Sequence, residues 1–381
     1  MKKQPMKITW SLPGHSRGGQ IDDAVLATPL PADRTCGEAT LCYGHYVRAV
    51  ETVLEKEAAG RGTGLFRALF SAPLPTVGSV HVEILKHGHF YHPARMTVCS
   101  DAGERSLVVN LAVTPEGGAC AEGEFALLKQ LSCRSAALPE VYALDAVDVD
   151  THRVVLFFGE WFEGFHEFHQ TRHDGKDRVV VWVGDDHVLL PPHQEASVYR
   201  QAAEILTRLY NPLTFELVQP WHHAAGDFVV NIDGEDPRVR LITVRQYTPM
   251  ADVEEPGAEE LLEGALYFLM LLSLRNRLDR YDGIGEVAWV GDHCVAATLQ
   301  GFFDGVAHLT DVGPLDGSFG DWVGRYLVAH TLEDFVETAC GVVSSFNPGA
   351  SEMGVVTAKA AEHGAAFYRA VQRMNTEEKR K

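Results

Sequence analysis

The chain has 381 residues, of which 46% are hydrophobic and 22% charged, a composition typical of globular proteins. A chain of this length can bury a large core and usually divides into two or more domains or lobes. Its formal net charge of −19 argues against a nucleic-acid partner, because binding to a phosphate backbone needs clustered lysine and arginine.

The N-terminal part predicts an extended segment followed by one helix. Residues 1 to about 40 are rich in Gly, Pro and Asp, and the basic start lacks the apolar stretch of a secretory signal. Residues 43–59 then predict a helix that ends at a glycine-rich stretch. Its apolar face comprises Val47, Val50, Val53 and Leu54.

The next part of the chain predicts a small, mostly antiparallel sheet. Three β-rich runs lie near 80–86, 94–100 and 106–113, and turn residues join them. The segment EGEFALLKQL has helical apolar spacing and carries Glu124, so we expect this helix to pack on the three strands. Two further strands follow, in LPEVYALDAVDVD and HRVVLFFGEW.

The second half of the sequence predicts mainly helices. An amphipathic helix at 196–210 precedes two short strands, DFVVNI and VRLITV, which the turn DGEDP joins. The remaining helices are expected at 258–278, 292–306, 321–344 and 353–374. The longest apolar run, ALYFLMLLSL, is far shorter than the roughly 20 residues of a membrane span and predicts a buried helix.

Several local patterns connect this order of elements to a known fold. Glu124 opens an apolar helix after the third strand, VLFFGE follows in the fifth, and Asp227 stands before the hairpin in PWHHAAGDFVVNIDGEDPRVRLITV. With the helix DHCVAATLQGFFDGV downstream, residues 80–345 resemble the protein-kinase-like fold, closest to the aminoglycoside and choline phosphotransferases. In that fold Glu124 would pair with a strand-three lysine, VLFFGE would be the inter-lobe hinge, and Asp227 would replace a metal-binding asparagine.

The resemblance implies a two-lobed α+β fold, with a small antiparallel-sheet N-lobe and a mainly helical C-lobe. The expected domains are an N-terminal extension with one helix (1–75), the N-lobe (76–160) and the C-lobe (161–375). It also implies ATP and Mg²⁺ as cofactors, and a small molecule or protein partner in the cleft between the lobes.

Three positions depart from the family pattern and predict an impaired site. Phosphoryl transfer depends on a lysine at the phosphates, on metal ligands and on a carboxylate near the attacking hydroxyl. The resemblance assigns these positions to Asn110, Thr243 and His222, and none of the three is a lysine or a carboxylate. The leading hypothesis is therefore a pseudokinase or kinase-like binding or regulatory protein that binds ATP and Mg²⁺ weakly or not at all.

An active phosphotransferase remains the first alternative. Lys86 or Arg95 would contact phosphates in place of the missing lysine, His222 would act as a base, and Asp227 would bind the metal. Against this, Lys86 and Arg95 also suit solvated strand positions, and His222 suits a hydrogen-bonded structural role.

A histidine-based metal hydrolase is the second alternative. His166, His169 and His173 fall at i, i+3 and i+7, so a helix would align them on one face, where imidazoles can bind zinc. No recognised ligand spacing is complete, and a polar helix face is the favoured interpretation of the pattern. Another candidate set comprises His222, His223 and Asp227.

The seven cysteines are dispersed and never spaced as CxxC. This pattern favours reduced thiols and a cytoplasmic protein over a disulfide framework or a thiolate zinc site. With the short apolar run and the negative charge, it predicts neither a membrane nor a nucleic-acid partner. The sequence specifies neither the ligand nor the oligomeric state.

Overall fold

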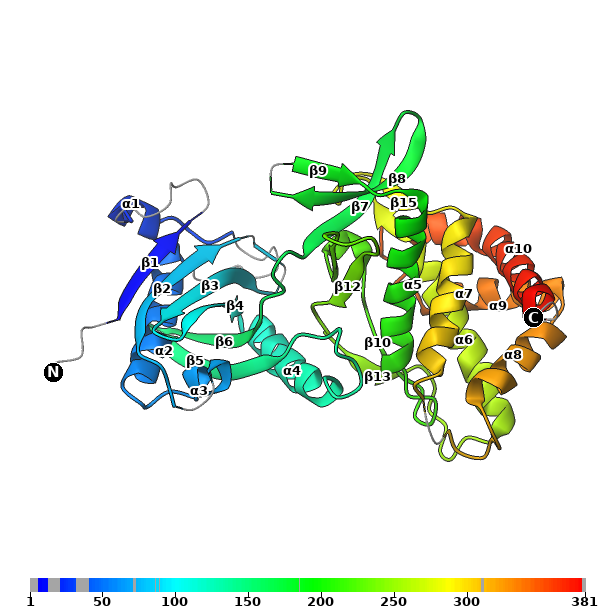
Figure 1. Ribbon diagram of the computed structural model, residues 1–381, viewed down its shortest axis with the longest axis horizontal. Coiled ribbons are helices and arrows are strands. Elements are labelled where there is room, and N and C mark those ends of the chain that lie inside the picture. Colours follow the sequence, from blue (N-terminus) through cyan, green and yellow to red (C-terminus); the bar gives the residue numbers. More distant parts are fainter. Residues whose placement is uncertain are drawn as a thin grey trace. The chain divides into compact units, whose positions relative to one another are not determined.

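The chain forms two compact units, each containing helices and strands (Figure 1). The computed structural model describes residues 6–12, 21–31, 41–70, 73–85, 87–88, 90–184, 186–309 and 312–378. The first unit comprises Met1–Ser132 and Pro139–Glu163, and the second comprises Cys133–Leu138 and Gly164–Lys381. The fold is therefore of the mixed α+β class that the sequence predicts.

A six-stranded sheet forms the basis of the first unit, in the order β1-β2-β3-β4-β6-β5. Its strands are β1 (Lys7–Ser11), β2 (Val77–Ile84), β3 (His92–Ser100), β4 (Gly103–Ala112), β5 (Val141–Val149) and β6 (His152–Glu160). β1 runs parallel to β2, and the other neighbouring pairs are antiparallel. The predicted pairing of the strands near 80–86, 94–100 and 106–113 is therefore confirmed.

Helix α2 (Tyr43–Ala58) packs on one face of this sheet. The predicted apolar residues of α2 are all buried, and they share a core with alternate residues of the strands. Trp10 of β1 joins the same core, with its ring 6.1 Å from that of Tyr46. The segment 1–75, expected as an extension, thus contributes to the core of the first unit. The described residues of the first unit also include two short helices, α1 (Asp23–Leu26) and α3 (Leu65–Leu69).

Helix α4 (Pro115–Leu131) packs on the opposite face of the sheet, as the sequence predicts. Thr114 caps its start by accepting a hydrogen bond from the Gly117 backbone, and Pro115 provides the first helical residue. Gly118 lets the helix approach β6, because a Cβ there would lie 3.1 Å from Val155. Glu124 is buried on this helix, with 1% of its surface exposed.

The second unit contains a five-stranded antiparallel sheet in the order β12-β11-β7-β8-β9. Its strands are β7 (His166–His173), β8 (Lys176–Val183), β9 (Asp186–Leu189), β11 (Phe228–Asn231) and β12 (Arg238–Leu241). The predicted hairpin is confirmed as β11 and β12, whereas the β7–β8 hairpin replaces the helix expected around the three histidines. Two smaller sheets pair β10 (Glu216–Val218) with β13 (Tyr247–Pro249) and β14 (Leu278–Arg280) with β15 (Val287–Trp289).

A short segment ahead of β5 is part of the second unit. The backbone N–H of Leu241 donates to the carbonyl of Ala137 at 3.1 Å. The guanidinium of Arg134 donates to the hydroxyl of Tyr247 at 2.6 Å. These contacts explain why residues 133–138 belong with the C-terminal part of the chain, although residues of the first unit flank them on both sides.

Helices make up the rest of the second unit. They are α5 (Pro192–Leu209), α6 (Ala258–Asn276), α7 (Asp292–Val306), α8 (Phe319–Ala329), α9 (Leu332–Val342) and α10 (Met353–Glu378), with 3₁₀ turns η1 (His223–Ala225) and η2 (Val343–Ser345). Glycines on α7 let it lie close to α5, since a Cβ at Gly305 would be 2.6 Å from the Cβ of Thr207. The apolar run predicted to be buried lies in α6 and is largely buried, as expected. Among the described residues no helix is long and apolar enough to span a membrane.

The prediction of a single helix for 321–344 is wrong, because the helix is interrupted between α8 and α9. His330 adopts an extended conformation, and Thr331 begins a new helix as its N-cap. The hydroxyl of Thr331 accepts a hydrogen bond from the backbone of Asp334, whose carboxylate accepts one from the Thr331 backbone. This capping box stabilises a helix start within a continuous apolar pattern.

Candidate functional site

The predicted metal ligand Asp227 lies immediately before β11 and is almost completely buried, with 1% exposed. It follows η1 and Gly226, whose φ of 68° is a left-handed conformation that glycine adopts without strain. Three donors surround its carboxylate. The backbone N–H of His222 donates to Oδ2 at 2.9 Å, and the guanidinium of Arg245 donates to Oδ2 at 2.8 Å and to Oδ1 at 2.6 Å.

Arg245 therefore occupies the position beside Asp227 where a metal ion would need to bind. A bidentate guanidinium pair uses both carboxylate oxygens and is among the stronger interactions of this kind. A magnesium ion would have to displace Arg245 and bind next to its positive charge. The sequence reasoning did not include Arg245, which lies beyond β12 and outside the quoted motif.

His222 is placed next to Asp227 by its backbone, and its side chain is 36% exposed. Burial lowers the pKa of its imidazole, the charge of Arg275 lowers it further, and the carboxylate of Glu352 opposes them. Nδ1 of His222 lies 4.0 Å from Oε1 of Glu352. The imidazole is consequently neutral at physiological pH and can accept a proton.

Thr243 lies between the end of β12 and Arg245, and it is half-buried. The neighbouring Ile242 donates its backbone N–H to the carbonyl of Asp227 at 2.9 Å, which places Thr243 next to the ion pair. The structure thus brings together the three predicted residues of the second unit, His222, Asp227 and Thr243. It adds Arg245 to them as a fourth member.

Arg95 and Asn110, two predicted phosphate-site residues of the first unit, lie on one face of its sheet. Arg95 on β3 pairs with Val108 on β4, two residues before Asn110. The guanidinium of Arg95 donates to Glu163 at 2.9 Å and to Ser106 at 3.1 Å, and it stacks 5.3 Å from the Trp161 ring. Arg95 is therefore engaged within its own unit. Lys86 lies outside the described residues.

Glu124 accepts a short hydrogen bond from the Tyr91 hydroxyl, with 2.6 Å between the oxygens. Burial and the charge of Glu124 raise the pKa of Tyr91 well above its usual value, so the phenol remains a proton donor. The ring of Tyr91 packs on Phe157, which pairs with Asn110 across β4 and β6. Glu124 and Asn110 therefore lie on the same side of the sheet.

The predicted helical face of His166, His169 and His173 is wrong, because these residues belong to strand β7. Side chains alternate along a strand, so His166 and His169 point to opposite faces. Burial lowers the pKa of His169, but Asp279 at 3.3 Å and Glu167 at 3.8 Å together raise it to about 9. A protonated imidazole has no lone pair for a metal.

No group of three or more potential metal ligands occurs within the described parts of the chain. The second predicted set also fails geometrically, because His223 is buried and its Nε2 contacts the side-chain oxygen of Asn276 at 2.9 Å. The metal-hydrolase alternative therefore has no geometric basis in these residues.

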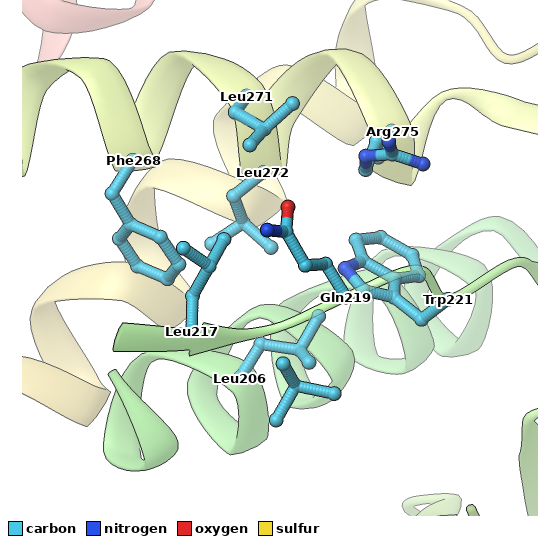
Figure 2. A pocket seen from close by; sticks show the side chains of 9 residues that line it. Leu206, Leu217, Gln219, Trp221, Phe268, Leu271, Leu272 and Arg275 are labelled. Carbon is cyan, nitrogen blue, oxygen red and sulfur yellow. The ribbon is translucent and has the colours of Figure 1, made fainter. Parts of the chain in front are cut away.

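A small pocket lies between α5, α6 and β10 in the second unit (Figure 2). Its apolar wall comprises Leu206, Leu217, Val218, Phe268, Leu271 and Leu272. The polar side chains that line it are Gln219, Trp221 and Arg275, the arginine whose charge acts on His222. Arg275 is 9% exposed and stacks 4.5 Å from the Phe346 ring. Its Nε has no hydrogen-bond partner within the described part of the chain.

Comparison with models of known protein families and with curated protein sequences finds no match.

Proposed function

We propose that this chain is a kinase-like binding protein that does not transfer phosphate. The observation that carries the proposal is the bidentate pair between Asp227 and Arg245. In the family that the sequence resembles, this position helps to hold the metal that neutralises the phosphates. Here Arg245 of the same chain neutralises the carboxylate of Asp227 instead, and the neighbouring Thr243 is uncharged.

The energetic cost of freeing Asp227 and the small number of available positive charges support the same proposal. Charge-assisted hydrogen bonds contribute roughly 1.5–3 kcal/mol each, so freeing Asp227 for a metal would sacrifice two of them. Asn110 on β4 is neutral, and Arg95 on β3 is already paired with Glu163. A triphosphate would therefore meet few of the charges that phosphoryl transfer requires.

The proposal is tested by nucleotide binding and turnover. We expect calorimetric titration of the purified protein with Mg²⁺ and ATP to give weak or undetectable binding, and we expect no ATP consumption above background. The informative variant is Arg245→Gln, which frees one oxygen of Asp227 and should increase Mn²⁺ or Mg²⁺ affinity. Arg373→Gln is the matched control, because Arg373 is an exposed arginine on α10 whose Nε donates to the backbone carbonyl of Arg369. ATP turnover at an ordinary enzymatic rate would contradict the proposal.

One observation favours an active phosphotransferase as a second candidate. The lowered pKa of His222 keeps its imidazole unprotonated at neutral pH, and its side chain is partly exposed. A histidine in this state can act as a general base. If the protein proves active, His222→Gln should reduce kcat by about 10²–10⁴-fold, as loss of a general base does. An unchanged kcat would eliminate this candidate.

A further inference from the structure

A cysteine, a histidine and an aspartate line up at the start of α2 in the first unit. The Sγ of Cys42 lies 2.9 Å from Nδ1 of His45, and Nε2 of His45 lies 3.2 Å from Oδ2 of Asp150. Cys42 is the N-cap of the helix, His45 is its third residue, and Asp150 stands in the turn between β5 and β6. None of the three was a candidate in the sequence.

The hydrogen bonds determine where the proton of His45 lies. The backbone N–H of Cys42 donates to Nδ1 at 3.0 Å, so Nδ1 carries a lone pair and Nε2 carries the proton. Nε2–H then faces the carboxylate of Asp150, which is the arrangement that keeps the imidazole in this tautomer. The unprotonated nitrogen therefore faces both the thiol and the backbone N–H of Cys42, and its one lone pair can take the thiol proton only when the backbone N–H releases it.

Arg48 on the next turn of α2 fixes the aspartate. Its Nη1 and Nη2 donate to the two oxygens of Asp150 at 3.2 and 2.7 Å. The hydrogen bonds from Arg48 lower the pKa of Asp150, so its carboxylate is charged. A charged and oriented carboxylate stabilises the imidazolium that forms when His45 takes a proton.

We propose that Cys42 is an activated nucleophile, with His45 as its base and Asp150 as a positioning residue, and that it reacts with small disulfides. In this reaction the backbone N–H of Cys42 releases Nδ1, Nδ1 takes the proton from Sγ, and Sγ attacks one sulfur of the disulfide. The S–S bond breaks, a mixed disulfide forms at Cys42, and the leaving thiolate takes the proton back from Nδ1. Cys42 is partly exposed, which gives small molecules access to Sγ.

The first test compares two cysteines of the same molecule. The full chain is treated with limiting glutathione disulfide at pH 7, and in parallel with iodoacetamide, and the modification of each cysteine is followed by mass spectrometry. Cys340 is the internal reference because it is exposed on α9. We expect Cys42 to react about tenfold faster than Cys340 in spite of its lower exposure, because an adjacent base activates the thiol. A rate equal to or below that of Cys340 would overturn the proposal.

The second test removes the base without removing the helix cap. Gln in place of His45 can still accept the Cys42 backbone N–H at the third helical position. His45→Gln should therefore slow modification of Cys42 by about tenfold while the helix content by circular dichroism stays unchanged. His152→Gln is the control, since that ring packs 5.6 Å from His45 without being its hydrogen-bond partner. Equal rates in His45→Gln and the control would overturn the proposal.

Asp150→Asn tests the positioning role separately. A neutral amide stabilises the imidazolium less, so the pH profile of Cys42 modification should shift towards higher pH. A purely structural role would leave that profile in place, and an unshifted profile would remove Asp150 from the proposal. The comparison of Cys42 with Cys340 in the unmodified chain does not depend on the folding of any variant.

Discussion

Replacing Arg245 with methionine tests whether the pair with Asp227 is the interaction that stabilises this part of the second unit. The change keeps most of the side-chain bulk and removes two of the three hydrogen bonds to a carboxylate that is 1% exposed. Removing one partner of a buried pair costs about 3–5 kcal/mol, because the remaining charge is left uncompensated. Arg245 is itself 22% exposed, so we expect the lower end, about 3 kcal/mol.

Urea unfolding followed by tryptophan fluorescence measures this loss, since Trp221 packs 5.6 Å from Phe228 next to Asp227. Arg373→Met is the control and should change the free energy of unfolding by less than about 0.5 kcal/mol. The double variant with Asp227→Asn should lose less than the sum of the two single variants, because they break the same pair. A loss below about 1 kcal/mol for Arg245→Met would refute the assigned role of the pair.

Three further predictions concern the second unit and the nucleotide. The pKa of His169 is raised from 6.5 to about 9, so its protonation contributes about 3 kcal/mol to the free energy of unfolding. This contribution should be complete below pH 6.5 and lost as the pH rises through 9. His169→Gln should abolish that pH dependence in unfolding titrations. Arg275→Met should raise the melting temperature, with a stabilisation of about 1–3 kcal/mol, since it removes a buried guanidinium whose Nε has no acceptor among the residues that the structure describes. A lower melting temperature would mean that the guanidinium has a partner in solution. The combined change Asn110→Lys and Thr243→Asp should increase calorimetric affinity for Mg²⁺ and ATP by about two to four decades, and unchanged affinity would count against the kinase-like assignment.

Hydrophobic periodicity was sufficient to predict strands β2 to β6 and helices α2 and α4 of the first unit, but it did not indicate β1, α1 or α3. Runs of alternating apolar residues around Val82, Met96 and Val109 predict paired strands, and the spacing of Val50 and Leu54 predicts a buried helix face. The β7–β8 hairpin was missed because the histidine spacing also fits a helix. The decisive local signal was Asp174-Gly175. Their φ values of 51° and 72° are those of a two-residue turn that joins the two strands of a hairpin.

The candidate site could be predicted only in part, for a physical reason. A resemblance to a family marks positions where expected groups have been lost, such as Asn110 and Thr243. It does not mark a group that has been gained, such as Arg245, because its role depends on a side chain reaching back to Asp227 across the end of a hairpin. Contacts between distant segments, such as that of His45 with Asp150, are likewise invisible to local spacing.

The assignment of residues 133–138 to the second unit has a practical consequence for dissecting the protein. A fragment beginning at Gly164 would lack the carbonyl of Ala137 that pairs with Leu241 and the guanidinium of Arg134 that holds Tyr247. Such a fragment would expose the edge of β12 and leave polar groups unsatisfied, both of which favour aggregation. Supplying the missing segment as a peptide, or grafting it onto the fragment through a flexible linker, should recover the solubility that simple truncation loses.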